Sequence, residues 1–132
     1  MKKLFLLLSL SLFTIQCNDA KDTVYNEFKV STLLKKYEYF KDLSAAIDKK
    51  RADIELYQIE ISSYTKEDDR FYVEQRKSEL IGIIAMHNQL CAEYNSAMSK
   101  FNYRFTNIGD LPEGATEPLP REYKPYINKL TK

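Results

Sequence analysis

Residues 80–108, LIGIIAMHNQLCAEYNSAMSKFNYRFTNI, decide the fold of this chain. Residues that are readily buried return along this stretch in alternating steps of four and three: Leu80, Ile84, His87, Cys91, Tyr94, Met98, Phe101, Phe105 and Ile108. This repeat of 3.5 residues is typical of a helix that packs lengthwise on another helix. Gly109 follows directly, and we expect the helix to end there.

The sequence before this stretch is also helical in character. Residues 23–81 contain no glycine and no proline, so no strong helix breaker interrupts them. Apolar positions again follow one another in steps of three and four, with one longer step: Val30, Leu33, Tyr37, Phe40, Leu43, Ile47, Ile54, Tyr57, Ile61 and Tyr64. The step from Ile47 to Ile54 is longer, and Lys50 and Arg51 form a polar layer within it.

A turn is predicted between the two patterns, at residues 62–69, SSYTKEDD. Ser, Thr and Asp side chains bond to nearby backbone and compete with helix interiors. Thr65 and Asp68 approximate a capping box, which marks a helix start. We therefore expect an all-α fold in which residues 23–108 form a long antiparallel two-helix hairpin, similar to a coiled coil. The alternative is one continuous helical rod that oligomerises, because no glycine or proline marks the turn.

The C-terminal tail, residues 109–132, is a different kind of segment. It contains Pro112, Pro118, Pro120 and Pro125, through which a helix cannot continue, so we expect an extended tail. Its apolar residues favour a tail that packs along the hairpin and covers apolar surface. The alternative is a docking peptide for an aromatic-lined groove on a partner protein.

The first sixteen residues read as a signal peptide. Lys2 and Lys3 are followed by an apolar run over residues 4–15. A helix of that run is ~18 Å long, too short for the ~30 Å hydrocarbon core of a bilayer. A basic start with an apolar run of this length is typical of secretory signal peptides. Residues 17–22 would then be a short linker.

Residues 14–17, Thr-Ile-Gln-Cys, place a cysteine directly after the apolar run. This arrangement resembles the lipobox of bacterial lipoprotein precursors. The resemblance implies cleavage between Gln16 and Cys17 and acylation of Cys17, which would become the mature N-terminus. Gln16 stands where the lipobox has a small residue, and ordinary signal cleavage after Ala20 is the alternative. That cleavage would remove Cys17 and release an unanchored protein.

A second resemblance covers about 35 residues near the C-terminus. Its motifs are Tyr94-Asn95-Ser96-Ala97, Phe101-Asn102 and Lys124-Pro125-Tyr126. They are similar to the last helix and tail of LemA-type helical envelope proteins. The chain is shorter than a whole LemA bundle, so the resemblance implies no site residue and no activity. It favours a non-enzymatic envelope protein.

Composition excludes several classes of function. The 20 basic and 19 acidic residues give no dominant basic face, so we expect no nucleic-acid partner. Two cysteines and one histidine are too few for the usual four-ligand zinc site, so we expect no metal and no cofactor. His87 and Cys91 share one helix face, and a metal or thiol site there is the less favoured alternative to simple burial.

The sequence therefore predicts a cell-envelope lipoprotein that is anchored to a membrane, on its periplasmic or surface side, through Cys17. We expect it to act as a binding or scaffolding protein, not as an enzyme. Its expected partners are the membrane, through the lipid, and an unidentified envelope protein, with self-association of the thin hairpin as an addition. The alternative is a secreted, unanchored helical protein that binds a host or phage factor.

Overall fold

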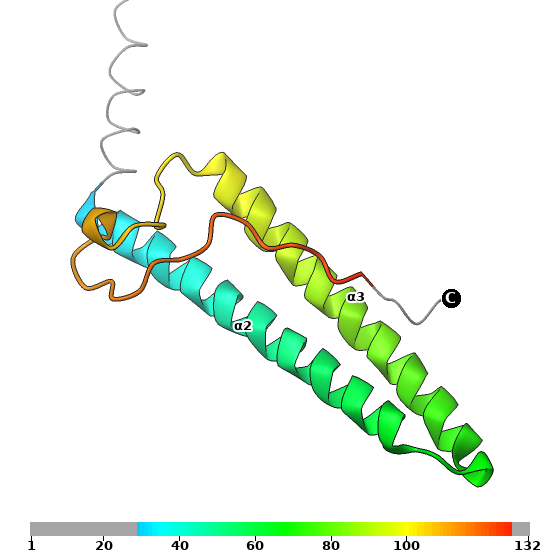
Figure 1. Cartoon of the computed structure of the whole chain (residues 1–132). Coiled ribbons are helices and arrows are strands. Elements are labelled where there is room, and N and C mark those ends of the chain that lie inside the picture. Colours follow the sequence, from blue (N-terminus) through cyan, green and yellow to red (C-terminus); the bar gives the residue numbers. More distant parts are fainter. Residues whose placement is uncertain (1–28, 128–132) are drawn as a thin grey trace, which may run out of the picture.

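The computed structural model describes residues 29–127, which form two long antiparallel helices and an extended segment that returns along them (Figure 1). Helix α2 spans Val30–Ser63 and helix α3 spans Arg70–Lys100. Two short 3-10 turns, η1 (Glu67–Asp69) and η2 (Ile108–Asp110), flank α3. The predicted helical hairpin is confirmed, and the continuous rod is wrong because the chain reverses between α2 and α3. The predicted signal peptide (1–16) and linker (17–22) lie outside the described residues.

The reversal of the chain occurs at short polar side chains, which form hydrogen bonds with the nearby backbone. The hydroxyl groups of Ser62 and Ser63 donate hydrogen bonds of 2.7 Å to the carbonyl oxygens of Ile59 and Glu60. Tyr64 then adopts an extended conformation and ends α2. The Lys66 N–H donates to the Asp69 carboxylate at 3.4 Å. The helix start therefore lies one residue later than the predicted pair of Thr65 and Asp68.

The apolar stripes of α2 and α3 meet in two clusters, which are separated at the predicted polar layer. The larger cluster contains Phe40, Ile47, Cys91 and Tyr94, and the smaller contains Ile54, Leu80 and Ile84. Between Ile47 and Ile54, the Lys50 ammonium pairs with Asp53 at 3.2 Å. Val30, which the stripe includes, is 56 % exposed and takes no part in either cluster.

Helix α3 ends at Lys100, eight residues before the predicted end at Ile108. Phe101 is already extended, and the chain stays non-helical to η2. Residues 101–105, FNYRF, also alternate aromatic and polar residues, which is the period of an extended chain. The aromatic rings pack against one another, and Phe101 and Phe105 stack with 5.7 Å between centroids. Phe105 is fully buried in the larger cluster, whereas Ile108 is 72 % exposed.

The extended tail then packs along the hairpin, as predicted. In Figure 1 the segment coloured orange to red returns from the open end of the hairpin along both helices. It turns at Gly114, whose φ of +95° is a conformation that other residues rarely adopt. Leu119 and Tyr123 join the larger cluster, and Tyr126 packs against the smaller one. The tail therefore closes one side of a core that two helices alone would leave open. We call residues 117–126 the strap.

Candidate functional site

Gln16 and Cys17, the predicted cleavage and acylation residues, lie outside the described residues 29–127. Within that range, no helix is both long enough and apolar enough to cross a membrane.

His87 and Cys91 are brought together, one turn apart on α3. The Cys91 Sγ lies 3.7 Å from Nδ1 and 3.8 Å from Nε2 of His87. Both side chains are completely buried, and burial raises the pKa of the Cys91 thiol. A raised pKa keeps sulfur in its weakly nucleophilic thiol form at neutral pH. Within residues 29–127, no three His, Cys, Asp or Glu residues are grouped to hold a metal ion.

The most organised polar contacts of the described chain lie between the helices and the strap. Hydroxyl and amide side chains of α2 and α3 bond to strap main chain at every third residue: Glu117, Pro120, Tyr123 and Tyr126. This period of three matches a polyproline-type chain, which has three residues per turn. The four helix residues that make these bonds, Tyr37, Asn88, Tyr94 and Asn95, define what we call the strap groove.

Asn88 and Asn95 each bind one strap residue through two hydrogen bonds. The Asn95 amide donates to the Tyr123 carbonyl at 2.8 Å and accepts from the Tyr123 N–H at 2.8 Å. Asn88 does the same for Tyr126, at 3.0 and 2.6 Å. Seven helical residues rise ~10.5 Å, and three extended residues span ~9–10 Å. The spacing of the two asparagines on α3 therefore matches the spacing of the two strap residues.

Two tyrosines bind the first half of the strap. The Tyr37 hydroxyl donates to the Glu117 carbonyl at 2.9 Å and accepts from the Glu117 N–H at 3.1 Å. The Tyr94 hydroxyl donates to the Pro120 carbonyl at 2.5 Å. Burial raises the pKa of Tyr94, so its hydroxyl stays protonated and remains a donor even in the alkaline range in which an exposed tyrosine ionises. Two of the ten tyrosines in the sequence are therefore buried and bind the strap main chain through their hydroxyl groups.

The strap's own tyrosines are seated in the groove by ring and hydroxyl. Tyr123 packs its ring edge-on to Tyr94, with 4.9 Å between centroids, and its hydroxyl bonds to Ser44 at 2.6 Å. Tyr126 accepts a hydrogen bond from the Gln58 amide at 2.7 Å. Burial raises the pKa of Tyr123 as well. These two side chains give the strap its register on the helices.

The sequence pattern does not single out Asn88, and Asn95 stands in it only as part of the Tyr94–Ala97 motif. One signal was available, because the two lie seven residues apart beside the apolar stripe of α3. A polar residue at that place is also the ordinary edge of a solvated helix face. Only the return of the tail over this edge shows that the two asparagines bind the strap and are not part of a solvated helix face.

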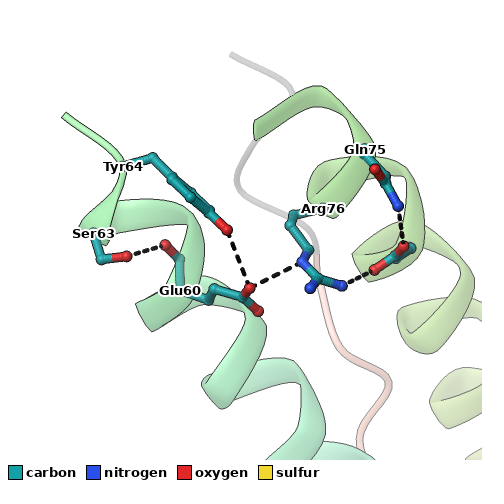
Figure 2. A network of polar contacts seen from close by, with 6 residues as sticks. Glu60, Ser63, Tyr64, Gln75 and Arg76 are labelled. Carbon is teal, nitrogen blue, oxygen red and sulfur yellow. Dashed lines mark hydrogen bonds and ion pairs between the residues drawn. The ribbon is translucent and has the colours of Figure 1, made fainter. Parts of the chain in front are cut away.

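Two other polar features lie away from the strap. At the turn, the Arg76 guanidinium contacts the carboxylate of Glu60 at 2.9 Å (Figure 2). It also contacts the carboxylate of Glu79, at 2.5 Å. A hollow of about 480 Å³ near the open end is lined by residues that include Lys36, Glu93 and Lys100. Its charges are of both signs and its lysines are exposed, so it favours no particular ligand.

Comparison of the chain with protein-family models, with curated proteins and with solved structures found no match.

Proposed function

We propose that this protein is a membrane-anchored lipoprotein of the bacterial cell envelope that acts by binding or scaffolding, without catalysis. The observation that carries the proposal is the sequence of residues 1–17, a basic start and an apolar run that end at Cys17. Two or more acyl chains on Cys17 would give stable anchoring. Cleavage before Cys17 also removes Lys2 and Lys3, leaving 18 basic and 19 acidic residues, so charge would add little attraction to an anionic membrane.

The exposed apolar side chains of the hairpin are consistent with a binding role. Helix α2 begins at Val30, thirteen residues after Cys17, so the hairpin would stand close to its anchor. Several large apolar side chains remain exposed on the two helices, among them Leu56, Ile59, Phe71 and Met86. In this proposal they are the side chains that would contact a protein partner, either an envelope protein or a second copy of the chain.

The test is incorporation of radiolabelled palmitate in cells that produce the full chain. The native chain and a Cys91→Ala variant should both take up label, and Cys17→Ala should take up none. Absence of label from the native chain would contradict the lipid anchor and favour the secreted, unanchored alternative, in which Cys17 is cut away.

The metal alternative at His87 and Cys91 has its own test. Elemental analysis of the purified protein should find no stoichiometric zinc. Zinc at one equivalent that disappears in His87→Ala would show a metal protein instead of a scaffold.

A further inference from the structure

The strap is held by the hairpin in the way that a receptor holds a peptide. We propose that the strap groove is a peptide-binding site, which takes up an extended, proline-containing segment of a partner protein in place of its own strap. The proposal names the chemistry of the partner and so rests on the binding role proposed above. It does not depend on acylation of Cys17.

The groove recognises main chain more than side-chain identity. Asn88, Asn95 and Tyr37 each donate to a strap carbonyl and accept from the N–H of the same residue. An asparagine amide offers one acceptor and two donors, so it can bind a peptide group as a neighbouring strand would. Any extended segment with free N–H groups at the equivalent positions could make these bonds.

The prolines show which positions of a ligand the groove leaves open. The strap N–H groups that donate belong to Glu117, Leu119, Tyr123 and Tyr126. Prolines, which have no N–H, stand at 118, 120 and 125, between these donors. The groove therefore accepts proline at some positions and excludes it at others. This pattern is typical of grooves that bind polyproline-type peptides.

The strap depends on the helices for its conformation. Among residues 29–127, its main chain makes a single backbone–backbone hydrogen bond, from the Leu119 N–H to the Phe105 carbonyl at 2.7 Å. Its other main-chain bonds are made by side chains of α2 and α3. A segment that is bonded mainly to its groove can be exchanged for another segment of equal length and register.

The ligand class follows from these contacts. It is a segment of about ten residues in polyproline-type conformation, with aromatic residues three positions apart. The two aromatic residues have free N–H groups for Asn95 and Asn88, and their rings take the places of Tyr123 and Tyr126. Because the strap occupies the groove in cis, an incoming segment must displace it, and its apparent affinity is lowered accordingly.

The experiment uses a fluorescent peptide with the sequence of residues 115–127, ATEPLPREYKPYI, and the purified full chain. Anisotropy should show weak binding to the native chain. The double variant Tyr123→Phe/Tyr126→Phe removes the hydroxyl bonds of the strap to Ser44 and Gln58 and keeps both rings. It should bind the peptide at least ten-fold more tightly, because its own strap competes less well.

Two controls test the recognition of main chain. A peptide that is N-methylated at the residues equivalent to Tyr123 and Tyr126 lacks both N–H donors, and it should bind at least ten-fold more weakly. Adding Asn88→Ala and Asn95→Ala to the double variant should weaken the unmethylated peptide by a similar factor. If the double variant keeps native helicity and binds the methylated and the unmethylated peptide equally well, the proposal is overturned.

Hydrogen exchange of the native chain gives a second measurement that needs no variant. Excess peptide should deprotect the amides of Tyr123 and Tyr126 in the chain's own strap. Unchanged protection while the peptide is bound would place the peptide elsewhere and contradict the proposal. Dimers that exchange straps without binding the peptide would assign the groove to a second copy of the chain and overturn the partner named here. Neither result bears on palmitate incorporation.

Discussion

Single side chains set the course of the tail. Asn95 sits at the edge of the core, where its amide satisfies both polar groups of the Tyr123 backbone. Cys91, one turn earlier, is buried beneath the strap, with its thiol 3.8 Å from the Lys124 carbonyl. Neither residue could be assigned its partner from the sequence, because both partners lie about 30 residues away along the chain.

Asn95→Ala tests the asparagine pair. The substitution leaves the N–H and carbonyl of Tyr123 without their bonds, and an unsatisfied, partly buried group costs ~1–3 kcal/mol. We expect the free energy of unfolding in urea to fall by about this amount. The control is Asn102→Ala at an exposed position, which should change it by less than ~0.5 kcal/mol. A loss of equal size in both variants would contradict the role of Asn95.

Thiol labelling tests the state of Cys91. Burial and a raised pKa should make the Cys91 thiol of a Cys17→Ser chain react roughly 100-fold more slowly with a disulfide reagent than the unfolded chain does. The rate should rise to the unfolded value in urea. Rapid reaction of the native chain at neutral pH would indicate an activated thiol and would favour the alternative of a thiol site at His87 and Cys91.

At the scale of elements, two glycines and one network of charged side chains affect the stability of the helices and the tail. Gly82 lies within α3, where an added Cβ would meet no atom within 4 Å. Gly114 lies in the tail at a positive φ, and an added Cβ there would lie 3.5 Å from Leu34 Cδ2. The network around Arg76 joins the end of α2 to the start of α3 across the turn (Figure 2). The helices themselves follow from apolar periodicity. The two glycines and the Arg76 network change the free energy of unfolding.

Alanine at the two glycines should have opposite effects. In α3, Gly82→Ala should raise the free energy of unfolding by ~0.5–1 kcal/mol, because alanine loses less backbone entropy in a helix. In the tail, Gly114→Ala should lower it by about 1 kcal/mol or more, because an L-residue is strained at φ +95°. Urea unfolding measures both. A stabilising Gly114→Ala would show that the tail turn differs from the one described.

The turn network should make stability depend on acid pH. The hydrogen bond from Arg76, and then that from Gln75, lowers the pKa of Glu79 from its usual 4.5. A carboxylate whose pKa is lower in the folded state stabilises the fold above its unfolded pKa. This contribution should disappear as pH falls from about 4.5 through the lower folded value. Glu79→Gln should flatten the pH dependence of urea unfolding in this range, and an unchanged profile would exclude the network as its source.

At the scale of the whole molecule, the strap changes a two-helix hairpin into a three-segment body. The helices bury one stripe against each other, and the strap adds Leu119 and Tyr123 to the same core. The hairpin keeps the molecule elongated, because α2 alone has 34 residues and is ~51 Å long.

Small-angle scattering of the purified protein tests this shape. We expect the hairpin to have a longest dimension of about 60 Å, from the length of α2 plus its turn. Two helices of 34 and 31 residues placed end to end would approach ~100 Å. A maximum dimension near ~100 Å for a monomer would contradict the hairpin in solution.

The sequence by itself determined the helices, the turn and the presence of an extended tail. These features follow from local rules: apolar spacing, the absence of glycine and proline, short polar side chains and clustered prolines act over a few residues. The same rules could not place the end of α3, because residues 101–105 satisfy both a helical and an extended period. Packing of Phe105 against Tyr37 and Phe40 decided for the extended form.

Only the tertiary structure decided where the tail lies and what Asn88 and Asn95 do. Their bonds join residues 28 and 38 positions apart, and hydrogen-bonding capacity in a sequence does not name a partner. The burial of His87 and Cys91 was expected from the stripe, but the strap that passes over Cys91 was not. A polar residue at the edge of a helix becomes a binding residue only when another segment covers it, and that is a property of the folded chain.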